Sequence, residues 1–178
     1  MRFDAMPIAT EKQIIEAELA AQNIWRNYYK EIFPKEQIEY MLHLYHSKEA
    51  VKKQIEQGYI HMTILLDGEI VGYMAYYVKG NCLYLPRLYI KPEYRRRGLA
   101  KEAVSRLENI FISPEHGYPH IKKIRRNLAR KNKFAIAVYE HMGFKKIKSV
   151  NLDIGHGFTR EDYVMEKVIT PKKVNKNG

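Results

Sequence analysis

Residues 82–111 read CLYLPRLYIKPEYRRRGLAKEAVSRLENIF, and no other segment predicts so much of the fold. The first nine residues are apolar and aromatic, as is typical of a strand, and Lys91 and Pro92 end that strand. Beyond Gly98 the apolar residues recur at helical spacing. They predict an amphipathic helix with one apolar stripe, formed by Ala100, Ala103, Val104, Leu107, Ile110 and Phe111.

The start of this helix is surrounded by cations. A helix N-terminus carries partial positive charge and unpaired N–H donors, so it normally attracts acidic side chains. Cations belong there when a strong anion lies among them. The order strand, tight turn and helix therefore predicts a phosphate-binding cradle with its bend at Gly98. A solvated basic turn is the alternative for an RRR run considered without this context.

The pattern Arg95-x-x-Gly98-x-Ala100 resembles the acetyl-CoA signature of the GNAT superfamily of N-acetyltransferases. Neither a P-loop nor a dinucleotide-binding glycine pattern is present. The resemblance implies that this loop and the first helical turn bind the pyrophosphate of acetyl-CoA. The residues concerned are Arg95, Arg96, Arg97, Gly98, Leu99, Ala100 and Lys101. Arg96 departs from the family, in which a second glycine is common.

Length and composition predict one globular domain. The chain has 178 residues, with 46% hydrophobic and 29% charged residues, which is ordinary for such a protein. We expect a single domain over residues 1–170 and a disordered basic tail over residues 171–178. The single cysteine, Cys82, excludes an intramolecular disulfide and favours a reducing, cytoplasmic location. No apolar run approaches membrane-spanning length.

The net charge of +11 is unevenly distributed along the chain. Residues 1–70 hold 8 Lys and Arg against 11 Asp and Glu, whereas the remainder holds 23 against 9. A basic half can serve a polyanionic cofactor such as coenzyme A. It also keeps open a nucleic-acid-associated or regulatory binding module. That alternative rests on the cations Lys122, Lys123, Arg125, Arg126, Arg130, Lys131 and Lys133.

The chain before residue 59 predicts three helices. Thr10 and Gln13 have the spacing of a capping box at the start of the first helix. Pro34 suits the first position of the second, and Ser47 is the expected N-cap of the third. His43 and His46 lie three residues apart on the second helix. No further ligand supports them, so we predict no metal site.

The chain after residue 59 predicts mainly strands. A hairpin is expected over residues 59–78, turning at Asp67-Gly68, and the strand 82–90 should pair next to it. The later elements expected are a strand at Ile121–Ala129, a helix at Lys133–Met142 capped by Asn132, and strands at Phe144–Val150 and Tyr163–Ile169. This order predicts an α/β fold with a sheet of mixed direction.

A second pattern also resembles the GNAT superfamily: Asn132-x-x-Ala135-Ile136-x-x-Tyr139-Glu140-x-x-Gly143-Phe144. The resemblance implies a mixed, mostly antiparallel sheet in which the strand holding Leu88, Tyr89 and Ile90 splays from its neighbour. Its open backbone groups would bind the pantetheine arm of acetyl-CoA. The resemblance also implies that Asn132 contacts the cofactor and that Tyr139 lies near the thioester sulfur. An aromatic residue of the core is the alternative for Tyr139.

The chemistry implied by the resemblance is attack of an amine on the acetyl thioester. A phenol with its ordinary pKa near 10 can protonate the departing thiolate, whose thiol titrates near 8.5. Backbone N–H near Leu88 or Ile90 would polarise the carbonyl. The general base stays unassigned, because Leu85-Pro86-Arg87 holds no carboxylate. Pro86 lacks an N–H and therefore predicts a bulge.

Several stretches resemble the spermidine/spermine N-acetyltransferase branch, among them residues 25–33 and the ending DIGHGFTREDYVMEK. The resemblance implies a small primary amine as partner, most simply a polyamine, with a protein or peptide amine as the alternative. A homodimer stays open. A polyamine requires carboxylates, and the candidates are Glu36, Glu39, Glu49, Glu56, Asp153, Glu161 and Asp162.

Overall fold

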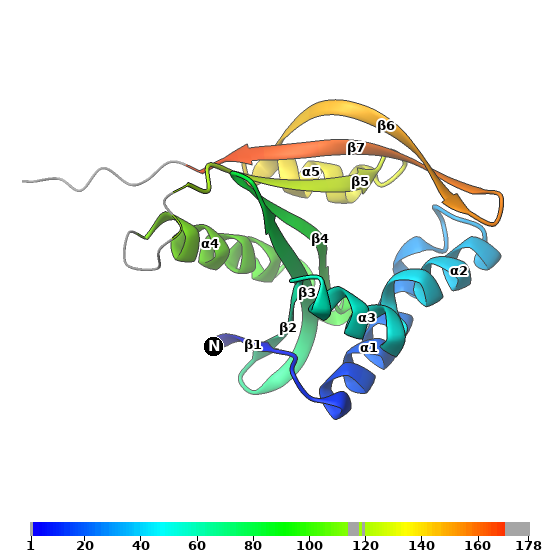
Figure 1. The fold of residues 1–178 in the computed structure, drawn as a ribbon, viewed down its shortest axis with the longest axis horizontal. Coiled ribbons are helices and arrows are strands. Elements are labelled where there is room, and N and C mark those ends of the chain that lie inside the picture. The colour runs from blue at the N-terminus through cyan, green and yellow to red at the C-terminus, as the bar shows by residue number, and fades with distance from the viewer. Residues whose placement is uncertain (1, 114–117, 119, 170–178) are drawn as a thin grey trace, which may run out of the picture.

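The computed structural model describes residues 2–113, 118 and 120–169 (Figure 1). The predicted tail at 171–178 lies outside the described residues, as do residues 114–117 and 119 of the loop that follows the fourth helix. In chain order the elements are β1 (Phe3–Pro7), α1 (Glu11–Tyr29), α2 (Lys35–His46), α3 (Lys48–Glu56), β2 (Ile60–Leu66), β3 (Glu69–Lys79), β4 (Cys82–Ile90), η1 (Pro92–Tyr94), α4 (Leu99–Ile112), β5 (Lys123–Ala129), α5 (Lys133–His141), β6 (Lys145–Gly155) and β7 (Phe158–Val168). No helix in the described ranges is long and apolar enough to cross a membrane.

Local signals set most of these boundaries. At the start of α1, Thr10 Oγ1 accepts from Gln13 N–H at 3.3 Å and Gln13 Oε1 accepts from Thr10 N–H at 3.0 Å, which confirms the capping box. Ser47 caps α3 through its side-chain oxygen. Asp67 and Gly68 have φ of 52° and 86°, as a two-residue turn of type I′ requires, so the predicted hairpin is confirmed.

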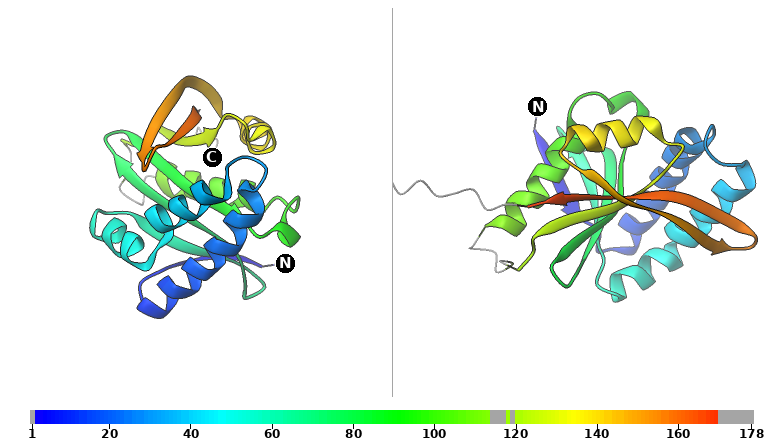
Figure 2. Two further views of the ribbon diagram at one scale, coloured as in Figure 1. Left: turned by 90° about the vertical axis from the view of Figure 1, so that its right-hand side faces the viewer. Right: turned by 90° about the horizontal axis from the view of Figure 1, so that it is seen from above.

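Within the described residues, seven strands form one sheet in the order β1-β2-β3-β4-β5-β7-β6 (Figures 1 and 2). Neighbours are antiparallel except β4 and β5, which run parallel. These two strands pair only over Cys82–Tyr84 and Lys123–Arg125. Beyond this short pairing they diverge, so the end of β4 has no β5 partner. The predicted fold class and the splayed strand are confirmed.

Three strands of the sheet differ from the sequence expectation. The edge strand β1 was not predicted, because its five residues lack the alternation of a half-buried strand and end in Pro7. Strands β6 and β7 are longer than expected and continue to a turn at 155–157, where Gly155, His156 and Gly157 all have positive φ. The residues near this turn are largely polar, and they remain in strands because β6 and β7 pair with each other.

The helices cover both faces of the sheet. Leu88 and Tyr89 are neighbours in β4 and therefore point to opposite faces. Leu88 belongs to the larger core, which contains residues of α4 and α5 such as Leu107 and Tyr139. Tyr89 belongs to a second, aromatic core with residues of α1 and α2 such as Trp25. The splayed end of β4 thus lies between two separate helical layers.

Buried histidines make stability depend on pH. Burial and the charge of Arg87 lower the pKa of His61 to about 4, and the pKa of His46 is also lowered, chiefly by burial. Because the unfolded chain binds a proton near pH 6.5 that the folded chain rejects, this stability is complete above pH 6.5 and is lost as pH falls toward 4. We expect His61 to make unfolding about 2 kcal/mol easier at pH 5 than at pH 7.5.

Urea unfolding at both pH values tests this expectation. His61→Gln, which retains an amide donor for Gln54, should remove that part of the pH dependence. The exposed His43→Gln is the matched control and should leave it intact. An identical pH dependence in the wild type and His61→Gln would contradict the assignment.

Candidate active site

The loop between β4 and α4 turns through two residues in the left-handed region. Arg96 has φ of 61°, and Gly98, the N-cap of α4, has φ of 76°. An L-residue with a side chain adopts this conformation at a cost of about 1–2 kcal/mol, which glycine avoids. This accounts for the second glycine in the signature that the loop resembles. A Cβ at Gly98 would meet no heavy atom within 4 Å, so the loop backbone faces open space.

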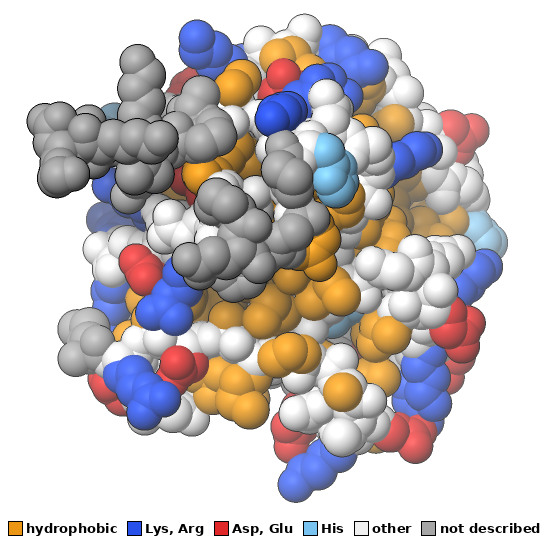
Figure 3. Space-filling view, turned by 60° about the vertical axis from the view of Figure 1, so that its left-hand side comes forward, with side chains coloured by type: hydrophobic (Ala, Val, Ile, Leu, Met, Phe, Trp, Pro, Cys, Tyr) orange, Lys and Arg blue, Asp and Glu red, His pale blue; other side chains and the backbone are white. Residues whose placement is uncertain are grey.

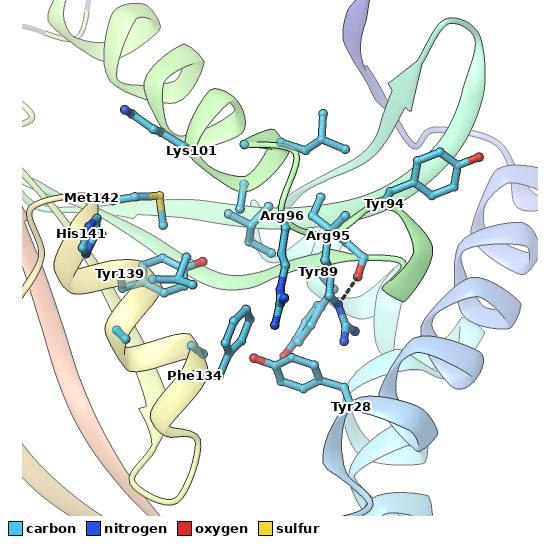
Figure 4. A pocket seen from close by; sticks show the side chains of 18 residues that line it. Tyr28, Tyr89, Tyr94, Arg95, Arg96, Lys101, Phe134, Tyr139, His141 and Met142 are labelled. Carbon is cyan, nitrogen blue, oxygen red and sulfur yellow. Dashed lines mark hydrogen bonds between the residues drawn. The ribbon is translucent and has the colours of Figure 1, made fainter.

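That open space is a cavity of about 470 Å³ between the loop, the splayed end of β4 and α5 (Figure 4). Most residues predicted from the sequence line it: Leu88, Tyr89, Ile90, Arg95, Arg96, Gly98, Leu99, Ala100, Lys101 and Tyr139. The other lining residues were not assigned to a site from the sequence: Tyr28, Tyr94, Phe134, Ala135, Ala137, Val138, His141 and Met142. The lining residues of α5 could have been predicted from the sequence, because they lie at helical spacing from Tyr139. Tyr28 comes from α1, and no local signal marked it.

Arg95 lines the cavity, and contacts with β4 and α1 hold its side chain in place. Its Nε donates to the backbone oxygen of Ile90 at 3.0 Å, and its guanidinium carbon lies 4.9 Å from the ring centroid of Tyr28. Burial lowers the pKa of the guanidinium. The remaining Nη2 is buried and has no hydrogen-bond partner among the described residues. A donor without a partner beside a cradle of backbone N–H groups fits a phosphate oxygen.

Two predicted residues do not line the cavity. The guanidinium of Arg97 lies over the ring of Tyr94, 5.1 Å from its centroid. Asn132 uses both ends of its amide elsewhere: Oδ1 accepts from the backbone N–H of Ala135 at 3.1 Å, and Nδ2 donates to the hydroxyl of Tyr28 at 2.7 Å. Asn132 therefore caps α5 and positions Tyr28. Direct contact of Arg97 and Asn132 with a cofactor stays a prediction.

Tyr139 belongs both to the core and to the cavity. Its ring packs edge-on against Phe144, with centroids 5.1 Å apart, while its side chain lines the cavity (Figure 4). Arg126 Nη1 donates a hydrogen bond to its hydroxyl. Burial raises the pKa of Tyr139 to about 12, although Arg126 acts in the opposite direction. The expectation of an ordinary pKa near 10 is wrong, because the phenol is buried.

The central strand holds a buried cation where a carboxylate was sought. Leu85 and Pro86 together oppose Tyr76 in β3, which confirms the predicted bulge. Arg87 follows, buried, with its guanidinium carbon 5.7 Å from the ring centroid of Tyr45 and Nη1 without a hydrogen-bond partner in the described part of the chain. Strand β4 therefore holds no carboxylate that could act as the general base.

A buried carboxylate is present on β7 instead. Asp162 is fully buried, and its Oδ2 accepts from Arg160 Nη2 at 2.8 Å. Within the described residues its Oδ1 has no hydrogen-bond partner, and burial raises the pKa of the carboxyl group. From the sequence, Asp162 was considered only as a candidate polyamine ligand.

The acids named for a polyamine site divide into two groups. Three are in ion pairs: Glu39 with Arg26, Glu161 with Arg130 and Asp162 with Arg160. The other four are Glu36, Glu49, Glu56 and Asp153, all of them exposed. The paired acids have less negative charge to offer an amine than the sequence alone suggests.

The basic stretch at 122–133 is not a continuous band of exposed cations. Lys123 and Arg125 both pair with Glu166, at 3.6 and 2.5 Å, and Arg126 is buried. On the face in Figure 3, lysine and arginine side chains are interspersed with acidic ones and border a hollow that contains hydrophobic side chains. This arrangement does not favour the nucleic-acid-associated alternative, which needs a connected basic surface.

The Acetyltransferase (GNAT) family matches residues 20–144, a range that includes both signatures and well over half of the chain. The chain belongs to the GNAT family. As a GNAT acetyltransferase it is an acetyl-CoA-dependent N-acetyltransferase, with acetyl-CoA as co-substrate. The open cradle at Gly98 and the buried Nη2 of Arg95 fit the phosphates of that molecule.

Individual relatives agree with this assignment. The spermidine N(1)-acetyltransferase of Thermoplasma acidophilum is 28% identical over 130 residues, which are 70% of this chain and 78% of the relative. The PaiA N-acetyltransferase of the same organism, solved in complex with coenzyme A, has a TM-score of 0.73 at 23% identity, covering 94% of this chain and 99% of that one. The spermidine N-acetyltransferase SpeG of Vibrio cholerae has a TM-score of 0.61 at 14% identity, covering 93% of each chain. The two structures establish the shared fold.

Metal ligands do not cluster in the part of the chain that the structure describes: it contains no group of three or more His, Cys, Asp or Glu placed to hold an ion. Of the two histidines considered from the sequence, His43 is exposed. His46 is buried, and its ring lies edge-on to Trp25 with centroids 4.6 Å apart. These two side chains therefore do not share an environment.

Proposed function

We propose that this GNAT acetyltransferase transfers the acetyl group of acetyl-CoA to a primary amine of a polyamine such as spermidine or spermine. The observation that carries the polyamine assignment is the 28% identity to a spermidine N(1)-acetyltransferase over 70% of this chain. The likeness of the fold to SpeG agrees with it. The exposed carboxylates Glu36 and Asp153 would contribute to the field that attracts the cation.

The proposed reaction is direct attack of the amine on the thioester. The loop N–H groups from Arg96 to Lys101 would hold the pyrophosphate, and the edge of Leu88–Ile90 that has no β5 partner would bind the pantetheine amides. A backbone N–H near Leu88 or Ile90 polarises the acetyl carbonyl. Tyr139 donates its hydroxyl proton to the departing sulfur. Support for this arrangement comes from the cavity, which all of these segments line.

The identity of the acceptor can be tested by comparing amines that differ in charge. A cationic protein attracts a polyamine only through local carboxylates, whose field is screened beyond about 8 Å at physiological ionic strength. We expect kcat/KM for spermidine, measured by release of free thiol, to exceed that for a monoamine of similar length roughly tenfold and to fall more steeply with added salt. Equal efficiencies with equal salt dependence would exclude the polyamine while retaining the acetyltransferase.

A second candidate acceptor is a peptide or protein amine that carries a carboxylate. Arg87 favours it, because this guanidinium is buried beside Tyr45 and has no ion-pair partner among the described residues. A peptide carboxylate would supply that partner. An acceptor screen that includes short peptides, each with a free and an amidated carboxyl terminus, separates this candidate from the polyamine. Preference for the free carboxylate that disappears in Arg87→Met would favour the peptide.

We also propose that residues 1–170 act as one domain in a reducing, cytoplasmic setting. Both hydrophobic cores pack on the same sheet, which supports a single domain. The single cysteine is a free, buried thiol, and burial raises its pKa, so it is poorly reactive. Limited proteolysis tests the domain: one protected fragment ending near residue 170 is expected.

A further inference from the structure

The guanidinium of Arg126 is in contact with the phenol of Tyr139. Arg126 is the first residue of β5 beyond the segment paired with β4, at the point where the two strands diverge. The side chain is buried, with 4% of the residue exposed. Its Nη1 donates to the hydroxyl of Tyr139, and its guanidinium carbon lies 4.4 Å from the centroid of the same ring. One guanidinium therefore contacts both the face and the oxygen of one phenol.

A buried guanidinium in this place requires an explanation. Within the described ranges Arg126 forms no ion pair with a carboxylate, and its Nε is buried without a hydrogen-bond partner. Burial disfavours its charge, and the phenols of Tyr139, Tyr89 and Tyr29 act against that effect. A cation removed from water normally requires a compensating anion. The charge of Arg126 also acts on the buried carboxyl group of Asp162, which is outside ion-pair distance. The group that Arg126 contacts directly and that can become anionic is the hydroxyl of Tyr139.

Proton donation by Tyr139 would create that anion. The raised pKa of Tyr139, about 12, lies well above the value near 8.5 of a thiol. This pKa already includes the lowering effect of Arg126, so without that guanidinium the buried phenol would be a still poorer acid toward a thiolate. A guanidinium bonded to the phenolic oxygen stabilises the phenolate more than the phenol, because charge-assisted hydrogen bonds are the stronger ones.

We propose that Arg126 is a positioning residue that orients the hydroxyl of Tyr139 and stabilises the phenolate left when its proton passes to the sulfur. This inference rests on the proposed role of Tyr139. In the step concerned, the amine nitrogen has bonded to the acetyl carbon, and the carbon–sulfur bond breaks with its electron pair on sulfur. The Tyr139 proton then moves to that sulfur, giving free thiol. The proton lost by the acceptor nitrogen passes to water, and Tyr139 recovers a proton from water.

A double-mutant cycle tests the inference, with kcat for thiol release as the main readout. Arg126→Met should lower kcat about 10- to 100-fold, the effect of losing one charge-assisted hydrogen bond in the transition state. The Kd of acetyl-CoA, measured by calorimetry, should change little, because Arg126 does not line the cavity. Arg126→Lys should recover part of the loss. Arg125→Met, one residue earlier and paired with Glu166, is the control and should retain kcat.

The decisive comparison is Arg126→Met in a Tyr139→Phe background. If Arg126 acts through the phenol, the double variant should have the kcat of Tyr139→Phe alone. Losses that multiply would overturn the inference and assign Arg126 a general structural role. An unchanged kcat in Tyr139→Phe would instead overturn the proposed acid itself. If Arg126→Met fails to fold, Arg126→Gln supplies the same cycle with a polar, uncharged side chain.

Discussion

Tyr139→Phe is expected to lower kcat by roughly 10²–10⁴, the usual contribution of a general acid. The substitution removes one hydroxyl and leaves the ring packed against Phe144, so folding should be retained. The affinity for acetyl-CoA should also be retained, because β4, the loop and the first turn of α4 together supply most of the lining and are unchanged. Thiol release under single-turnover conditions measures the chemical step directly.

The control for this variant is Tyr163→Phe. Tyr163 is half-buried, packs on the same core and lies under Lys146, away from the cavity lining. It should lose no more than about twofold in kcat, since substitutions away from a functional site have small effects. If Tyr139→Phe also retained full single-turnover activity, Tyr139 would have to be regarded as a core residue only.

Gly98→Glu is expected to abolish the stabilisation that acetyl-CoA gives to the wild type. At 100 times its Kd a ligand that binds only the folded state stabilises it by about 2.7 kcal/mol, which is roughly 5–10 °C in Tm for a chain of this size. The glutamate places bulk and negative charge in open space at the cradle, where the pyrophosphate would lie. Scanning calorimetry with and without acetyl-CoA gives the shift.

Gly58→Glu is the matched control for the cradle variant. Gly58 follows α3 and has φ of 90°, and a Cβ there would meet no heavy atom within 4 Å, so a glutamate meets the same kind of backbone strain. It lies outside the cavity lining and should retain the full shift with acetyl-CoA. Gly98→Gln, which lacks the charge, should show an intermediate shift. A normal shift in a folded Gly98→Glu protein is incompatible with the assignment of the cradle.

Elements whose signals lie within a few residues were predictable from the sequence. The bounds of β4, Cys82 to Ile90, follow from an apolar run that ends at Lys91 and Pro92. The cap of α5 by Asn132 and the bulge at Pro86 likewise depend on neighbours in the chain or on the chemistry of one residue. The two signatures lie in such segments, which is why the family was accessible without a structure.

Other features depend on residues that meet only when the chain folds. Tyr28 lines the cavity from α1, and its hydroxyl is bound by Asn132, which lies 104 residues later in the chain. In the sequence Arg126 was one of the cations on which the nucleic-acid alternative rested, but in the folded chain it is buried against Tyr139. The raised pKa of Tyr139 has the same origin, since desolvation depends on every group packed around the phenol. Burial and long-range pairing are properties of the whole arrangement, and no local pattern encodes them.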